Sequence, residues 1–164
     1  MANDTPNRSY TLYTDGACAG NPGPGGWGAI ILEKGSDEEI ILSGGEKSTT
    51  NNIMEMTAVL EGVKKINSLK ENPEEPVAIQ ILSDSQYVVK GLTSWIWNWI
   101  RSKWHKSDGK PVLNRKLWEA LLEQLRSNSY KLQWVRGHED NVYNNRCDAL
   151  AVSESLKYKK GETS

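Results

Sequence analysis

Five short runs of apolar, β-branched and aromatic residues predict strands, because glycine, proline or polar residues bound each run. They cover residues 10–14, 27–32, 39–45, 77–82 and 130–135. Short links join the first three runs, which is typical of an antiparallel meander. The last two runs each follow a helical segment, so we expect crossover connections and a mixed sheet.

Four other segments repeat apolar residues every three or four positions and predict helices. The clearest begins at Asn52 and ends before Pro73, with Met56, Val59 and Val63 on its apolar face. The other three are expected over residues 86–92, 113–126 and 145–156. The predicted fold class is therefore α/β.

The 164 residues are 37% hydrophobic and 25% charged, with a formal net charge of −1. This length and balance are typical of one globular domain, here residues 1–164. Overall charge does not indicate a nucleic-acid binder, so such a role must depend on local charge. The polar residues 1–9 lack the apolar core of a secretion signal, and no apolar run is long enough to cross a bilayer. We expect a cytoplasmic monomer with no membrane partner.

Cysteine usage agrees with that compartment. Cys18 and Cys147 are far apart in the chain and form no C-x-x-C motif. Free thiols in a reducing compartment are favoured, and a disulfide or a metal site stays open as the alternative.

The glycine-rich stretch after Asp15 has two interpretations. Residues 23–28, GPGGWG, fit the G-x-G-x-x-G pattern of dinucleotide-binding loops. That motif has to open a helix, whereas Pro22 and Pro24 interrupt this stretch and a β-branched run follows it. We therefore reject nucleotide binding. We expect a strand that ends on Asp15 and an irregular loop whose backbone leaves room for a ligand.

Four carboxylates stand where a charged group is costly unless it is paired or bound to a metal ion. Asp15 and Asp84 end apolar strands, Glu55 adjoins the apolar face of a helix, and Asp148 opens the last helix. Oxygen ligands with one imidazole nearby, from His138, suit Mg²⁺ or Mn²⁺ better than zinc. Two such ions about 3.5–4 Å apart support phosphodiester hydrolysis in other enzymes.

Local sequence also leaves a purely structural explanation open for each of these residues. The alternatives are a helix cap for Asp84, a turn for Asp15, a surface charge for Glu55, a helix-dipole partner for Asp148 and a surface loop for His138. Sequence alone does not show that the five side chains converge.

Residues 101–116 carry six Lys or Arg against one acid, Asp108, and they overlap a tryptophan-rich stretch. Positive charge interleaved with aromatic side chains is typical of nucleic-acid-binding surfaces. A solvated basic face is the alternative.

Five blocks of sequence together resemble, in order and spacing, the motifs of type 1 ribonuclease H, the bacterial kind in particular. They read YTDGACAGNPGPGGWGAI, TTNNIMEMTAVLEGV, LSDSQYVVKGL, WIWNWIRSKW and WVRGHEDNVYNNRCDALA. The resemblance extends from about Ser9 to Leu156. It implies a ribonuclease H-like fold, with a five-stranded mixed sheet of three antiparallel and then two parallel strands, and helices on both faces.

The resemblance also implies an endonuclease that hydrolyses the RNA strand of RNA/DNA hybrids with two Mg²⁺ ions, leaving 5′-phosphate and 3′-hydroxyl ends. By position, Asp15 would touch both ions, Glu55 and Asp84 would favour the ion that activates water, and Asp148 would favour the other. His138 is similar to the family's loop histidine, which assists proton transfer and product release. Here two acids, Glu139 and Asp140, follow it, in place of small residues.

Substrate contacts follow from the same resemblance. The positions that face the minor groove of the hybrid are Cys18, Asn21, Asn51, Asn52 and Gln86, and those of the DNA-strand phosphate pocket are Thr50 and Asn114. The basic segment, with Arg101, Lys103, Lys106 and Lys110, is similar to the protrusion that binds DNA phosphates. Trp95 belongs to the same region, although its spacing of one helical turn from Trp99 favours packing over base stacking.

Two other functions remain open at this point. One is a hybrid-binding module without catalysis, which the complete set of carboxylates argues against. The other is a DNA nuclease of the same fold, which residues suited to sensing 2′-hydroxyls, such as Asn21 and Gln86, argue against.

Overall fold

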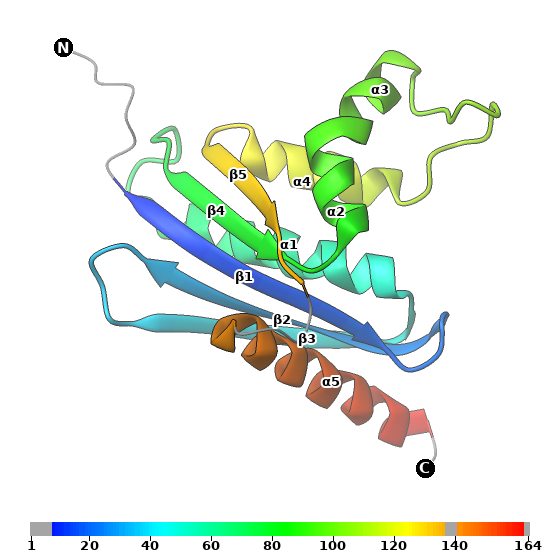
Figure 1. The fold of residues 1–164 in the computed structure, drawn as a ribbon, viewed down its shortest axis with the longest axis horizontal. Helices are drawn as coiled ribbons and strands as arrows, with labels where there is room; N and C mark the ends of the chain where they lie inside the picture. The colour runs from blue at the N-terminus through cyan, green and yellow to red at the C-terminus, as the bar shows by residue number, and fades with distance from the viewer. Residues whose placement is uncertain (1–7, 137–140, 163–164) are drawn as a thin grey trace.

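The computed structural model describes residues 8–136 and 141–162, and a five-stranded sheet forms its centre (Figure 1). The strands are β1 (Ser9–Cys18), β2 (Gly23–Glu33), β3 (Glu39–Thr49), β4 (Ala78–Ser83) and β5 (Ser129–Trp134). Their order across the sheet is β3-β2-β1-β4-β5. The first three pair antiparallel, β4 lies parallel to β1, and β5 lies parallel to β4. The predicted mixed sheet, and with it the α/β fold class, is confirmed.

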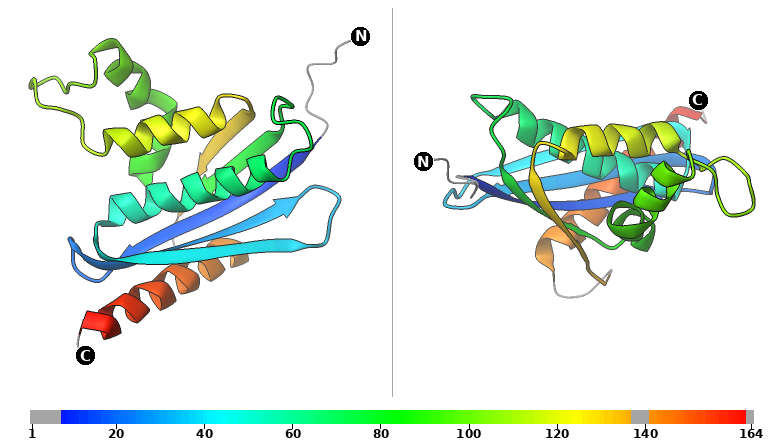
Figure 2. Two further views of the ribbon diagram at one scale, coloured as in Figure 1. Left: turned by 180° about the vertical axis from the view of Figure 1, so that it is seen from behind. Right: turned by 90° about the horizontal axis from the view of Figure 1, so that it is seen from above.

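Helices cover both faces of this sheet. They are α1 (Asn51–Ser68), α2 (Gln86–Lys90), the π-helical turn η1 (Gly91–Trp95), α3 (Ile96–Arg101), α4 (Arg115–Leu125) and α5 (Val142–Glu162). Helix α5 packs on β1, β2 and β3, whereas α1 and α4 lie together on the opposite face (Figure 2). Among the described residues, no helix is both long enough and apolar enough to cross a membrane.

The main core lies between the sheet and α1. Leu12 and Ile81 from the strands and Met56 and Val63 from α1 are fully buried there. Trp118 of α4 is also fully buried and extends this core toward α2 and α3. Burial of this apolar area removes it from water and is the main stabilising contribution to the fold.

The first strands differ from the expectation. Asp15 lies inside β1, not at its end, and the irregular loop is shorter than predicted, since it covers only residues 19–22. Residues 15–18 pair with residues 25–28 in a regular antiparallel ladder. Glycine pairs through its backbone as any residue does, and here neighbouring helices cover the backbone that has no side chain. The prediction that these glycines break the strand was therefore wrong.

Two helices also differ. The segment from Gln86 continues through η1 and α3 to Arg101, nine residues beyond its expected end at Leu92. Helix α5 begins at Val142, so Asp148 lies in its second turn and does not open it. The Asn141 side chain accepts a hydrogen bond from the Asn144 amide at 3.1 Å at this earlier start.

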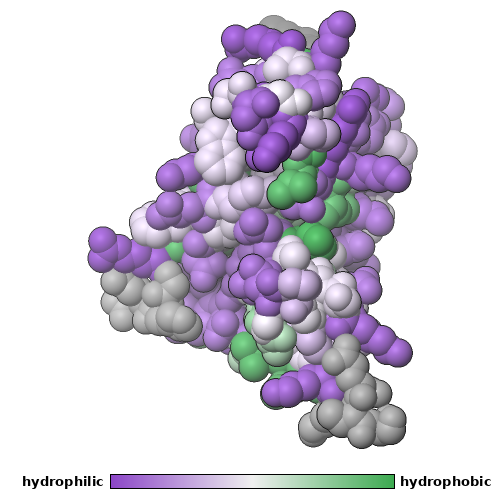
Figure 3. Space-filling view, turned by 90° about the vertical axis from the view of Figure 1, so that its right-hand side faces the viewer, coloured by the Kyte–Doolittle hydropathy of each residue, from purple (hydrophilic) through white to green (hydrophobic). Residues whose placement is uncertain are grey.

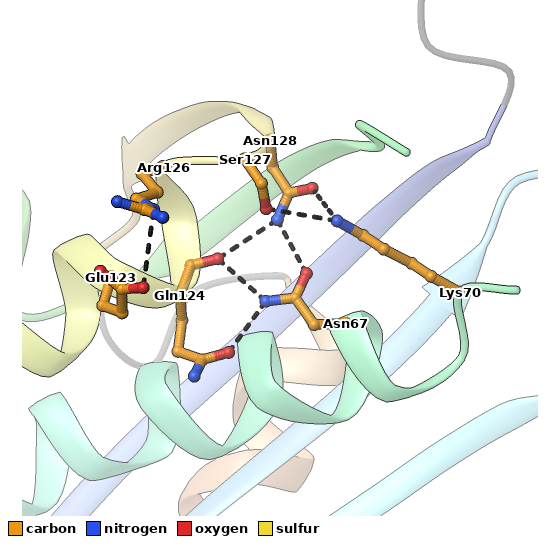
Figure 4. Close-up of polar contacts among 7 residues, drawn as sticks. All are labelled: Asn67, Lys70, Glu123, Gln124, Arg126, Ser127 and Asn128. Carbon is orange, nitrogen blue, oxygen red and sulfur yellow. Dashed lines mark hydrogen bonds and ion pairs between the residues drawn. The ribbon is translucent and has the colours of Figure 1, made fainter. Parts of the chain in front are cut away.

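A polar network joins the C-terminal ends of α1 and α4 (Figure 4). The Asn67 amide nitrogen donates to the main-chain and side-chain oxygens of Gln124 at 2.9 Å, and Asn128 donates back to Asn67 at 2.9 Å. Lys70 donates to Asn128 at 2.7 Å, and the same Asn128 oxygen accepts from the Val77 amide at 3.2 Å. The network therefore secures the starts of β4 and β5, whose opposite ends carry polar residues discussed below.

Candidate active site

Asp15 and Asp84 come from adjacent parallel strands. The last parallel pair of β1 and β4 joins Thr14 to Ser83, and one aspartate directly follows each of these residues. Because parallel strands run in the same direction, both carboxylates lie at the same edge of the sheet. The pairing brings together residues that are 69 positions apart in the sequence.

Glu55 reaches the same place from α1, through a close approach at Gly16. A β-carbon on Gly16 would lie 2.6 Å from the Glu55 amide nitrogen, so only glycine lets α1 come this near to β1. The Gly16 amide also donates to the Asp15 carboxylate at 2.8 Å. The Asp15-Gly16 pair thus supplies one acid and the space for another.

Asp15, Glu55 and Asp84 form an acidic cluster that could hold a cation. One carboxylate oxygen from each lies within 4.8 Å of the other two. The Oε2 atom of Glu55 is buried and has no hydrogen-bond partner among the described residues. Buried oxygens without protein donors are costly, and hard cations such as Mg²⁺ prefer oxygen ligands, so the donor set fits such an ion.

Burial and mutual proximity both raise pKa values within the cluster. Burial, and then the neighbouring charge of Asp84, raise the pKa of Asp15 to about 8. Burial, and then the charges of Asp15 and Asp84, raise the pKa of Glu55 well above its usual value. Without a cation, the Asp15 carboxyl therefore retains its proton at neutral pH.

Asp148 stands beside this cluster and does not belong to it. Its charge contributes to the raised pKa of Asp15, which means that the two carboxylates interact. The preceding residue, Cys147, is fully buried, and its thiol donates to the Tyr13 carbonyl at 3.3 Å. Burial raises the pKa of this thiol to about 12, so Cys147 holds α5 against β1 as an unreactive group.

Two of the structural alternatives are resolved. Ser85, not Asp84, caps α2, because its side chain accepts from the Val88 amide at 3.2 Å. Asp148 is too far inside α5 to serve the first helical turn. Cys18 and Cys147 are both free thiols, as expected.

The raised acidities predict an unusual pH dependence of stability. The pKa of Asp15 is about 8 in the folded protein and 3.8, its ordinary value, in the unfolded chain, so between these two pH values the folded protein holds a proton that the unfolded chain has lost. The free energy of unfolding of the metal-free protein should therefore fall as pH rises through this window. We expect a lower thermal midpoint at about pH 8.5 than at about pH 5.5 in EDTA, with Mg²⁺ restoring it at the higher pH. An equally steep pH dependence in Asp15→Asn would contradict this assignment.

Several predicted substrate residues gather at the ends of β1, β3 and α1. The Asn21 side chain accepts from the Asn51 amide at 3.2 Å, and the Cys18 thiol donates to the Thr49 carbonyl at 3.4 Å. Thr50 caps α1 by accepting from the Ile53 amide at 3.2 Å. Asn51 and Asn52 follow as the exposed first residues of α1.

Gln86 and Asn114 occupy a second group around Tyr87. Gln86 is the exposed first residue of α2. Asn114 adopts a left-handed conformation with a φ of 62°, and its amide donates to the Tyr87 hydroxyl at 3.1 Å. Sequence reasoning missed Tyr87, since a tyrosine within a short helix gives no signal of its own.

Trp95 belongs to an aromatic cluster. Its ring centroid lies 5.9 Å from that of Trp99 and 6.0 Å from that of Tyr87, and Trp99 lies 5.4 Å from Trp118. These contacts agree with the predicted packing role, whereas a substrate contact of Trp95 stays a prediction. Trp95 also lines a hollow of about 500 Å³ with residues of the basic segment, Lys106 among them.

The basic segment projects from the body of the protein after α3 (Figure 1). Trp104 is buried, and its carbonyl accepts from the Val112 amide at 2.9 Å, which closes the loop. The positive side chains predicted to bind phosphate all remain exposed: Arg101, Lys103, Lys106 and Lys110. His138, Glu139 and Asp140 lie outside the described residues.

Comparisons with known proteins agree with this fold. The family model described as RNase H matches residues 7–155. The chain is 47% identical over 140 residues to the ribonuclease H of Bordetella pertussis, covering 85% of this chain and 84% of that protein. It is 48% identical over 140 residues to the ribonuclease H of Pelobacter propionicus, with coverages of 85% and 80%.

Among solved structures, the chain is similar to the crystal structure of LC9-RNase H1, described as a type 1 RNase H with the type 2 active-site motif. The TM-score is 0.81 at 27% sequence identity, and the match covers 95% of this chain and 76% of the other. The chain is therefore an enzyme that belongs to the ribonuclease H family, of the type 1, bacterial kind.

Proposed function

We propose that this chain hydrolyses the RNA strand of RNA/DNA hybrids in a reaction that needs two Mg²⁺ ions and leaves 5′-phosphate and 3′-hydroxyl ends. The observation that carries the proposal is the cluster of the buried Asp15 and Glu55 with the partly buried Asp84, within a ribonuclease H fold. Such a cluster costs stability in the absence of a cation, which argues for a function that uses one.

Asp15, Glu55 and Asp84 would hold the ions, with Asp148 as the fourth ligand. When bound, two such ions supply charge that activates a water and stabilises the leaving oxygen of a phosphodiester. The chain's own contribution is to hold the carboxylates close together and largely shielded from solvent, so that a bound cation would favour their ionised forms. His138, in the segment after β5, is proposed to assist proton transfer and product release.

Recognition of the hybrid is proposed for the polar residues at the C-terminal ends of β1 and β3 and at the starts of α1 and α2. Cys18, Asn21, Asn51, Asn52 and Gln86 offer donors and acceptors that can sense the 2′-hydroxyls of an RNA strand in a minor groove. Thr50 and Asn114 would hold a phosphate of the DNA strand. The hydrogen bond between Asn21 and Asn51 supports this assignment, because it fixes two of these residues relative to each other.

The basic segment is proposed to bind phosphates of the DNA strand farther along the duplex. Arg101, Lys103, Lys106 and Lys110 are exposed on a part of the chain that projects toward solvent. The end of the molecule that carries this segment is mostly hydrophilic, with small and separate hydrophobic areas (Figure 3). A polar and charged partner suits this surface better than an apolar one. Binding should therefore weaken as salt increases.

A cleavage assay tests the proposal. Labelled RNA/DNA hybrid, RNA/RNA duplex and DNA/DNA duplex are incubated with and without Mg²⁺, and the product ends are mapped. We expect RNA to be cut only in the hybrid and only with metal. Salt-sensitive hybrid binding without cutting would favour a binding module instead, and cutting of the DNA duplex would favour a DNA nuclease of the same fold.

A further inference from the structure

Asp84 lies in the short connection between β4 and α2, outside the regular hydrogen bonding of both elements. β4 ends at Ser83, and α2 begins at Gln86 with Ser85 as its cap. The Ser83 hydroxyl accepts from the Ser85 amide at 3.0 Å and so tightens the turn on either side of Asp84. The position of the Asp84 carboxylate therefore depends on the hydrogen bonds that fix Asp84 and Ser85, the two residues between β4 and α2.

Trp134 reaches this link from β5. Its indole nitrogen donates to the main-chain carbonyl of Asp84 at 3.0 Å, which is the geometry of an ordinary hydrogen bond. Trp134 is the last residue of β5 and the register partner of Ser83, and the next amide, Val135, donates to the Ser83 carbonyl at 2.9 Å. Trp134 at the end of β5 and Val135 directly after it therefore bind the carbonyls of Asp84 and Ser83.

The exposure of Trp134 is informative. The residue is 41% exposed, so much of its large ring contributes little to the core. A tryptophan at the end of an edge strand is not needed for burial, whereas a long side chain with a donor is needed to reach across to β4. The structure thus favours a role for the indole N–H over a role for the ring.

We propose that Trp134 is a positioning residue, which fixes Asp84 through its main-chain carbonyl so that the carboxylate is set for cation binding. This inference rests on the proposed function of the acidic cluster. The same hydrogen bond joins the end of β5 to Asp84. Trp134 precedes His138 by four residues in the sequence.

The test removes the donor and keeps the ring. Trp134 is replaced by 3-benzothienylalanine, in which sulfur takes the place of the indole N–H, and in a second variant by phenylalanine. Trp97→Phe is the matched control, because Trp97 is 47% exposed and lines the groove between α3 and α4. Each protein is titrated with Mg²⁺ alone by calorimetry, its thermal midpoint is measured, and the Mg²⁺ dependence of hybrid cleavage is recorded.

Both Trp134 variants should need about threefold to tenfold more Mg²⁺ for half-saturation, the range that loss of one ordinary hydrogen bond allows. The thermal midpoint of the metal-free benzothienyl variant should fall by no more than a few degrees, as loss of one hydrogen bond predicts, and Trp97→Phe should keep the wild-type Mg²⁺ affinity. Wild-type Mg²⁺ affinity in the benzothienyl variant would overturn the proposal, even if Trp134→Phe were impaired, because the ring alone would then be responsible. If the Trp134 variants bind Mg²⁺ more weakly than the wild type, but the wild type does not cut the hybrid, the proposed function is refuted and this inference stands.

Discussion

Asp15→Asn should abolish hydrolysis of the RNA strand while hybrid binding stays nearly unchanged. Asp15 belongs to the acidic cluster, and it is 6% exposed, so the surrounding water cannot take over its role as a cation ligand unless the site rearranges. Asparagine keeps the shape but removes the negative charge that would hold a cation. We expect cleavage to fall by at least about a thousandfold, since a bound metal ion supplies several kcal/mol of transition-state stabilisation.

Asp37→Asn provides the matched control, because Asp37 is an exposed carboxylate in the turn between β2 and β3. It should cleave the hybrid at the wild-type rate. Single-turnover cleavage and equilibrium hybrid binding are measured for both variants. Cleavage by Asp15→Asn within about tenfold of the wild type would refute the assignment of Asp15 as a metal ligand.

Gly26→Ala should separate α5 from the sheet and thereby affect both stability and catalysis. Gly26 pairs with Ala17 in β1, and a β-carbon on it would lie 2.2 Å from the Ala151 carbonyl and 2.7 Å from the Ser155 amide nitrogen. These are backbone atoms of α5 and cannot turn aside, so the whole helix has to move. We expect a loss of about 3 kcal/mol in the free energy of unfolding, in the upper part of the range for overpacked cores.

Catalysis should also fall in Gly26→Ala, because α5 carries Asp148 beside the acidic cluster. Gly62→Ala is the control, because the atoms nearest to its new β-carbon belong to the Leu12 side chain, the closest at 2.5 Å, and not to the backbone of another element. Alanine also favours the helical conformation of α1 by up to about 1 kcal/mol, which offsets some of the crowding. Urea unfolding and cleavage rates are compared, and equal losses in the two variants would contradict a specific role for the backbone contact at Gly26.

The sequence alone determined much of this protein. Apolar periodicity predicted five strands and most of the helices at nearly their observed positions, because burial of one face imposes a repeat that is visible locally. The motif blocks identified the family, and strand ends and helix faces singled out Asp15, Glu55 and Asp84. These three residues could therefore be proposed as candidates without the structure.

Only the tertiary structure decided how those residues meet. The strand continues past Asp15 because Gly16 and Gly26 leave room for helices on opposite faces of the sheet. The sequence around a glycine does not indicate which distant helix will cover it. Convergence of Asp15 with Asp84 depends on the parallel pairing of β1 and β4, a contact between segments distant in the chain. The indole of Trp134 reaches the Asp84 carbonyl because β5 pairs with β4, which is another contact between segments distant in the chain. Residue types and their periodicity are local properties, whereas register and close approach are set by packing between elements that sequence spacing does not reveal.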